Sequence, residues 1–143
     1  MTSSLSSSFL VRFWGVRGSY PTPGADTLRY GGNTPCVEVQ VNGLTINLDS
    51  GTGIIPLGRS LAQRARHSGR AVEALILLSH LHHDHNQGFP FFVPAFQPAS
   101  RLYLYGPDLL GETPRSTLEQ MMQPPFFPIR LNETAAELRC DTL

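Results

Sequence analysis

The stretch of sequence from residue 72 to residue 85 reads VEALILLSHLHHDH, and it decides the expected fold. Residues 72–78 form a nearly continuous apolar run, which is typical of a central β-strand buried on both faces. A cluster of histidines and one aspartate follows directly. Because α/β sheets place their sites at the carboxyl ends of strands, the stretch predicts a functional site where this strand ends.

Four of the five histidines lie within this cluster, and their spacing predicts metal binding. Side chains alternate in an extended chain, so His80, His82 and Asp84 point to one side, and His85 follows as the chain turns. His80 and His82 can then hold one ion, and Asp84 and His85 a second. Imidazole and carboxylate ligands suit Zn²⁺, Mn²⁺ or Fe. The alternative role for Asp84 is to cap a following helix.

Outward from this stretch, the patterns predict alternating strands and helices. The apolar and alternating runs favour strands at 9–14, 34–41, 44–48, 72–78, 101–105, 127–131 and 136–140. Helical spacing favours helices at 54–66, near 86–92 and at 111–123. This interleaving predicts an α/β fold in one domain over residues 9–143, preceded by a disordered Ser-rich tail at 1–8.

A long glycine- and proline-rich loop spans residues 17–32. Loops of this length in a compact domain are often functional. We predict that Arg17, Gly31, Gly32 and Asn33 contact a substrate, with Arg17 and glycine amides binding phosphate; a plain covering loop is the alternative.

Composition excludes several classes of function. The chain has 143 residues and a formal net charge of zero, and this neutral balance argues against a broad nucleic-acid-binding surface. All eleven cationic residues are arginine, so the chain has no P-loop lysine and no lysine for a Schiff base. No signal peptide and no membrane span is predicted. Cys36 and Cys140 are too few for a disulfide framework, so we expect free thiols and a cytoplasmic protein.

The cluster also carries a family resemblance. The pattern His80-x-His82-x-Asp84-His85 after an apolar strand resembles the signature of the metallo-β-lactamase-fold hydrolases. Residues 13–24 (FWGVRGSYPTPG), 30–36 (YGGNTPC) and 48–53 (LDSGTG) are similar to the ribonuclease Z and phosphodiesterase-like branch of that superfamily.

The resemblance implies roles for the clustered residues and for one aspartate outside them. His80 and His82 match ligands of the first metal, and Asp84 and His85 match ligands of the second. Asp84 is also similar to the residue that orients the attacking water, which makes it the candidate catalytic residue. Asp49 matches a buried aspartate that hydrogen-bonds the ligand loop.

The resemblance covers only the first half of the family's duplicated αββα sandwich. Further ligands come from the second half in that family, but no histidine follows His85 here, and only Asp108 and Asp141 are later aspartates. The second half also covers the inner face of the first sheet. We therefore expect an exposed apolar face carrying Val37, Val39, Ile46 and Leu77, and either self-association or a separate C-terminal half.

The function implied is that of a metal-dependent hydrolase with two zinc ions, acting on a small-molecule or nucleotide phosphodiester or a related ester. Thioesterase, glyoxalase-like or lactonase chemistry is one alternative on the same metals. A metal-binding remnant without catalytic activity, or a half domain that depends on a partner, is the other.

Overall fold

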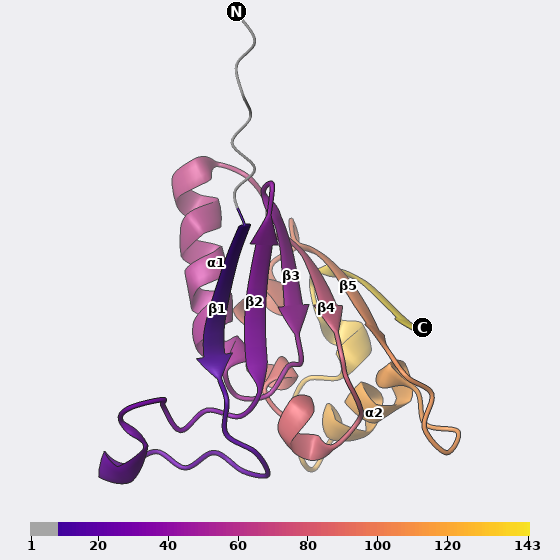
Figure 1. Cartoon of the computed structure of the whole chain (residues 1–143). Coiled ribbons are helices and arrows are strands. Elements are labelled where there is room, and N and C mark those ends of the chain that lie inside the picture. The colour runs from indigo at the N-terminus through magenta and orange to yellow at the C-terminus, as the bar shows by residue number, and fades with distance from the viewer. Residues whose placement is uncertain (1–8) are drawn as a thin grey trace, which may run out of the picture.

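A computed structural model describes residues 9–143 of the chain, and the predicted disordered tail at 1–8 lies outside the described residues. These residues form one mixed sheet with helices, which confirms the predicted α/β class (Figure 1). The strands are β1 (Phe9–Gly15), β2 (Cys36–Val41), β3 (Leu44–Leu48), β4 (Glu73–Leu77), β5 (Arg101–Gly106) and β6 (Glu137–Thr142).

The sheet follows the order of the chain, β1-β2-β3-β4-β5-β6. The pairs β1–β2 and β2–β3 are antiparallel, and β3 to β6 are parallel to one another. An Asn-Gly hairpin joins β2 to β3, with φ of 50° at Asn42 and 86° at Gly43, the values that favour these two residue types. Because β3, β4 and β5 are parallel, their carboxyl ends meet at one edge of the sheet.

Two α-helices and several short turns connect the strands. The first helix, α1 (Ile54–Ser68), corresponds to the helix predicted at 54–66 and ends at Gly69, which has the left-handed conformation. The second, α2 (Pro114–Met121), begins at Thr113, which accepts a hydrogen bond from the Ser116 N–H. The remaining helical turns are η1 (Ala25–Thr27), η2 (His83–His85), η3 (Phe89–Phe91), η4 (Val93–Phe96) and η5 (Leu131–Glu133).

Two local predictions are wrong, and proline explains both. The helix predicted near 86–92 is replaced by the separate 3₁₀ turns η2, η3 and η4, since Pro90 and Pro94 each remove a backbone donor. The strand predicted at 127–131 is absent. It follows Pro124 and Pro125 and contains Pro128, which again cannot donate to a sheet.

All the helical elements that contact the sheet lie on one of its faces, behind the sheet in the view of Figure 1. This covered face carries the core, in which Ile76, Leu102 and Leu104 of the central strands meet Phe89 and Phe92. Burial of these side chains stabilises the arrangement by about 1.5–3 kcal/mol for each one fully removed from water.

A buried carboxylate ties the first two strands to α1 on this covered face. Glu38 is fully buried and accepts hydrogen bonds from Trp14 Nε1 at 2.9 Å and from Arg64, with Arg12 at 3.4 Å. Burial alone would raise the pKa of Glu38, but the donors, above all Arg64, outweigh it and hold the pKa below its usual value. These donors therefore stabilise the ionised form of Glu38 in a buried environment that would destabilise an unpaired charge.

Within residues 9–143 no helix covers the opposite face of the sheet, which we call the open face. Register places three cross-strand rows on it. The first row is Phe13, Val37, Leu48, Leu77, Tyr105 and Asp141; the second is Val11, Val39, Ile46, Leu75, Tyr103 and Arg139; the third is Phe9, Val41 and Leu44, with Glu73, Arg101 and Glu137 on β4–β6.

The open face is apolar over β1 to β3 and in the first two rows of β4, and its charged residues lie on β4 to β6. Phe9 and Phe13 are about 70% exposed (70% and 68%), while Val37, Val39, Ile46 and Leu77 are half-buried by one another. The prediction that β4 is buried on both faces is therefore wrong for this chain, because Leu75 and Leu77 lie on the open face. An apolar run in the sequence indicates that both faces of the strand favour burial, but it does not show whether a second layer covers the outer face.

Two further sequence predictions meet the structure here. Among the described residues, no helix is long and apolar enough to cross a lipid bilayer. Cys36 and Cys140 are both buried free thiols, and burial raises the pKa of each, that of Cys140 to about 11. Their low reactivity at neutral pH follows, since the thiolate is the reactive form.

Candidate metal centre

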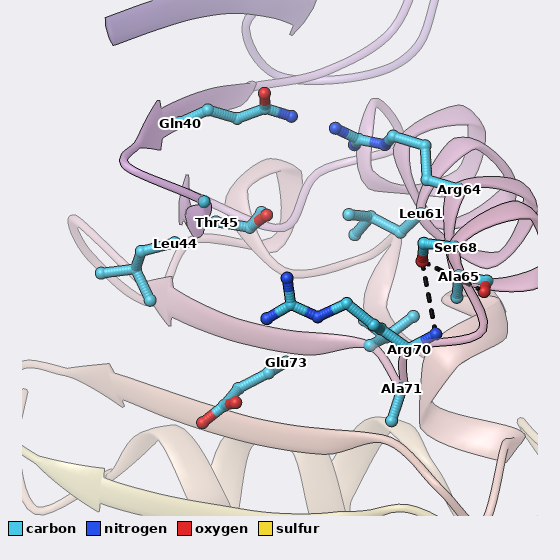
Figure 2. Close-up of a pocket in the computed structure, with 12 residues that line it drawn as sticks. Gln40, Leu44, Thr45, Leu61, Arg64, Ala65, Ser68, Arg70, Ala71 and Glu73 are labelled. Carbon is cyan, nitrogen blue, oxygen red and sulfur yellow. Dashed lines mark hydrogen bonds between the residues drawn. The ribbon is translucent and has the colours of Figure 1, made fainter. Parts of the chain in front are cut away.

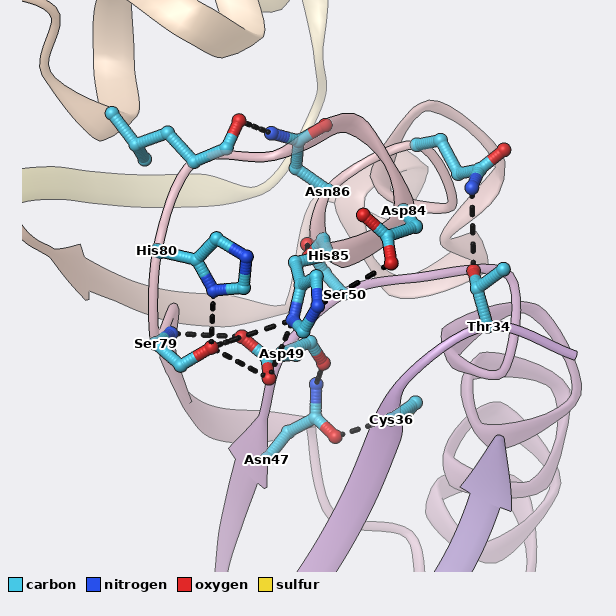
Figure 3. Close-up of polar contacts among 12 residues, drawn as sticks. Thr34, Cys36, Asn47, Asp49, Ser50, Ser79, His80, Asp84, His85 and Asn86 are labelled. Atoms are coloured by element: carbon cyan, nitrogen blue, oxygen red, sulfur yellow. Dashed lines mark hydrogen bonds and ion pairs between the residues drawn. The ribbon is translucent and has the colours of Figure 1, made fainter. Parts of the chain in front are cut away.

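The histidine cluster lies where β4 ends, beside the end of β3 (Figure 3). β4 ends at Leu77, and the chain passes through Ser79 and His80 into the turn η2, which carries His83, Asp84 and His85. Asp49 follows β3 directly and its N–H donates to Leu77 O at 2.9 Å. The parallel pairing of β3 with β4 thus brings Asp49 against the cluster, although 30 residues separate it from Ser79.

The structure brings three imidazole rings together. The ring centroids of His80 and His85 are 3.9 Å apart, and those of His80 and His82 are 4.5 Å apart. Asp84 closes the group, with its Oδ2 at 3.4 Å from His85 Nε2. The four residues predicted as ligands therefore converge on one place at the edge of the sheet.

Asp49 orients this group through both carboxylate oxygens. Its Oδ1 accepts from the backbone N–H of Ser79 at 2.8 Å and from Ser79 Oγ at 2.8 Å, and its Oδ2 lies 2.9 Å from His85 Nδ1. Asp49 itself has φ of 63°, and Asn47 Nδ2 donates to its carbonyl at 2.7 Å. A carboxylate on Nδ1 fixes the tautomer that leaves Nε2 of His85 free toward Asp84.

The donors fit a divalent ion best at Asp84 and His85. Two ligands of one tetrahedral zinc ion lie roughly 3.3 Å apart, given bonds of about 2.0–2.1 Å, and the Nε2–Oδ2 distance is 3.4 Å. As the side chains stand, however, no group of three or more His, Cys, Asp or Glu residues within 9–143 is arranged to hold an ion. The geometry thus offers one pair of metal donors, His85 Nε2 and Asp84 Oδ2, and the rings of His80 and His82 lie next to this pair.

The charges of the site favour the forms that bind metal. Burial, followed by the neighbouring rings of His85 and His82, lowers the pKa of His80 and so favours its neutral imidazole. Burial acts to raise the pKa of Asp84, but the Ser19 N–H and His85 outweigh it and keep the pKa below its usual value. An ionised carboxylate and a neutral imidazole are ligands typical of zinc.

Two residues of the site escaped the sequence analysis. Ser79 Oγ lies 3.0 Å from His80 Nδ1 and also bonds Asp49, so it links the two. Ser19, from the long loop, donates its N–H to Asp84 Oδ2 at 2.8 Å with φ of 71°. Ser79 could have been suspected from its place before His80, but no signal in the sequence pointed to Ser19.

The residues predicted to contact substrate lie in the loop that Ser19 anchors, and several serve the loop itself. The Gly31 N–H donates to Thr27 O at 2.7 Å, and Asn33 O accepts from the N–H groups of Val16 and Arg17. Gly32 packs so closely that a Cβ would lie 2.2 Å from Thr22 O. Arg17 is exposed to solvent.

The later aspartates lie elsewhere. Asp108 Oδ1 accepts from the Gly111 N–H at 3.1 Å in a turn, and Asp141 lies on β6, on the open face. Neither is brought to the histidines.

A separate polar hollow of about 320 Å³ lies at the other end of the sheet (Figure 2). It is bordered by Gln40 and Thr45 from the β2–β3 hairpin and by Arg64 and Arg70 from α1 and the segment that follows. Since it adjoins the start of β4 and the histidines adjoin its end, the two sites are separate.

Replacing Asp49 by asparagine is expected to weaken zinc binding by roughly 10–100-fold, the usual cost of losing the outer partner of a ligand histidine. Asparagine tolerates the positive φ at this position, so the fold should survive. Competition with a zinc-binding dye measures the affinity. Asp108→Asn is the matched control, and equal affinities of wild type and Asp49→Asn would contradict the role given to Asp49.

Comparison with known proteins finds similarity among solved structures. No family model matches the sequence, and no curated protein matches it. Among solved structures, the chain is similar to one described as a new diphosphatase from the PhnP family, with a TM-score of 0.49 and 18% sequence identity. The alignment covers 93% of this chain and 50% of that one, so the chain spans about half the length of that structure.

Proposed function

We propose that this chain is the N-terminal half of a metallo-β-lactamase-type αββα domain and a metal-dependent hydrolase of phosphodiester or related ester bonds. The observation that carries the proposal is the convergence of His80, His82, Asp84 and His85 at the end of β4, held by Asp49. Zinc is the ion we expect, two in a complete domain, with Mn²⁺ or Fe as substitutes that the same donors accept.

Bound ions would supply Lewis-acid activation of water and stabilisation of the charge that develops on the substrate. His80 and His82 would hold one ion, and Asp84 and His85 the other. Asp84 stays ionised through the Ser19 N–H and His85, so it can accept a hydrogen bond from a water molecule and orient it. Asp49 and Ser79 keep the imidazoles in place during these steps.

The same donors indicate that this half works poorly alone. A catalytic zinc ion needs about three protein ligands and one open position, whereas the proposed assignment gives each ion two and no group of three donors is arranged for an ion within residues 9–143. A misplacement of about 1 Å can cost a hundredfold in rate. We therefore propose that the site is completed either by a second unit that covers the open face or by a second copy of the chain.

The absence of a third donor for each ion within residues 9–143 also favours a second candidate, a metal-binding unit without catalysis. Thioester or lactone hydrolysis on the same ions is a further variant of the first candidate, since the fold leaves the scissile bond open.

One set of measurements separates these candidates. The zinc-loaded chain is expected to bind bis-p-nitrophenyl phosphate, to hydrolyse it very slowly or not at all, and to lose the binding when zinc is removed. Parallel assays use a thioester and a lactone. If the thioester or the lactone is hydrolysed faster than the phosphodiester, that ester class replaces the phosphodiester as the proposed substrate. If none of the three compounds binds in a zinc-dependent manner, the second candidate, a metal-binding unit without catalysis, is supported.

A further inference from the structure

The polar hollow at the far end of the sheet, of about 320 Å³, has a volume at the lower end of the range for small-molecule sites. It opens between the β2–β3 hairpin and the carboxyl end of α1, and two arginine side chains line it from the helix side (Figure 2). Arg64 comes from α1, and Arg70 comes from the segment that joins α1 to β4. Two cationic side chains that line one small hollow indicate a site for an anion.

Arg70 brings donors to the hollow that the residues around it do not use. The residue is exposed, and Figure 2 shows no hydrogen bond from its guanidinium to the other residues drawn. Its backbone N–H donates to Ser68 Oγ at 3.3 Å, which holds the chain at this point. A guanidinium presents a planar fork of N–H donors that binds a carboxylate through two parallel hydrogen bonds. Arg70 can therefore offer this fork to a ligand.

Arg64 brings a second guanidinium, which is only partly engaged. Its Nη2 donates to the buried carboxylate of Glu38, while the Arg64 side chain stays 38% exposed. Because a guanidinium has five N–H donors, this ion pair leaves others for a ligand in the hollow. The negative charge of Glu38 offsets much of the charge of Arg64, so Arg70 is the dominant cation of the hollow.

Thr45 adds a hydroxyl to the same wall. The residue is only 8% exposed, and Figure 2 shows its side chain reaching from β3 into the hollow, between the two guanidinium groups in this view. No hydrogen bond joins the hydroxyl to the other residues drawn there. Buried polar side chains in native proteins are nearly always paired. An anion in the hollow would accept a hydrogen bond from Thr45 Oγ1 as well as from the arginines.

The rest of the wall favours a singly charged anion with an apolar part. Leu61 and Val72, each 6% exposed, give the hollow an apolar surface on which a short hydrocarbon chain can pack. The carboxyl end of α1, at Ser68, carries partial negative charge, and Glu38 adds a full one beside Arg64. Both act against a second negative charge on the ligand, so the wall fits a carboxylate better than phosphate.

We propose that the polar hollow binds a small organic acid with one carboxylate and a short apolar chain. The carboxylate accepts hydrogen bonds from Arg70, Arg64 and Thr45 Oγ1. The hydrocarbon chain packs on Leu61 and Val72. The hollow adjoins the start of β4 and the histidines adjoin its end, so this binding needs no metal ion and does not rest on the proposed hydrolase function.

Butanoate is the probe, and amide NMR spectra of the wild-type chain show where it binds. Saturable shifts are expected for residues 40–45 and 68–72, and none of comparable size for residues 79–86. Butanamide has nearly the same shape without the charge, and it is expected to bind about tenfold more weakly, because hydrogen bonds to charged groups are the stronger ones. Inorganic phosphate is also expected to bind more weakly than butanoate.

Variants test the side chains. Arg70→Gln is expected to weaken butanoate binding by roughly tenfold, and Thr45→Val, which replaces the hydroxyl by a methyl group, by about threefold. Arg66→Gln is the control, since it removes the same charge from the exposed side of α1 outside the hollow and should leave binding unchanged. Arg64 is kept in every variant, because its loss would leave Glu38 buried without its main partner.

Several results would overturn the proposal. These are an absence of saturable shifts around the hollow, equal binding of butanamide and butanoate, tighter binding of phosphate than of butanoate, and butanoate binding that Arg70→Gln leaves unchanged.

Discussion

A chain in which His80 and His82 are both replaced by alanine is expected to release its zinc on dialysis, whereas the wild-type chain retains it. The two imidazoles are half of the proposed ligands, and their rings lie 4.5 Å apart beside Asp84 and His85. Their removal should cost more affinity than the roughly 10–100-fold lost with an outer partner such as Asp49. Elemental analysis after dialysis against excess zinc measures the retained metal.

The control keeps the number of lost histidines the same. His67→Ala/His83→Ala removes the two histidines outside the proposed ligand set, one in α1 and one in η2. This variant is expected to hold as much zinc as wild type. Equal zinc in wild type and in His80→Ala/His82→Ala, with both folded by circular dichroism, would refute the metal centre.

The second large effect is expected from the open face. Light scattering should give the wild-type chain a mass well above 15.7 kDa, because the apolar rows on β1 to β4 are covered by nothing within residues 9–143. Each aliphatic side chain that a second copy removes fully from water contributes about 1.5–3 kcal/mol. Ile46→Glu, in the middle row, should shift the chain strongly toward the monomer, since an unpaired carboxylate there opposes coverage.

The fold should survive this change, because the Ile46 side chain lies on the open face and the core lies on the other. Leu110→Glu is the matched control: Leu110 is 98% exposed in a turn away from the sheet, and its replacement should leave the association unchanged. A wild-type chain that stays at 15.7 kDa at all concentrations would show that the open face needs no partner. If that monomer hydrolysed phosphodiesters in a His80-dependent manner, the proposal of a half site would fall.

The local patterns of the sequence were sufficient for most elements of the fold. Alternation and turn residues predicted β1, the β2–β3 hairpin, β4 and β5, because side-chain period and the positive φ of Asn-Gly act within a few residues. The same locality explains the failures at 86–92 and 127–131. Both predictions relied on the spacing of apolar residues. That spacing takes no account of the backbone donors that are missing at Pro90, Pro94 and Pro128.

The candidate site divides in the same way. By itself, the sequence predicted the candidate ligand set, because His80, His82, Asp84 and His85 lie within six residues and extended geometry puts them together. Only the tertiary structure decided that the Asp49 carboxylate contacts Ser79 and His85, and that the Ser19 N–H donates to Asp84. These contacts join segments that are 30 to 65 residues apart in the sequence. They depend on parallel strand pairing and loop packing, and neither of these produces a periodic pattern in the sequence. The tertiary structure also decided that Thr45, Arg64 and Arg70 line the same hollow. The open face is also a feature that only the tertiary structure decided. Apolar alternation in a strand indicates that one of its faces favours burial, whereas only the packing of the folded chain shows whether another layer covers that face.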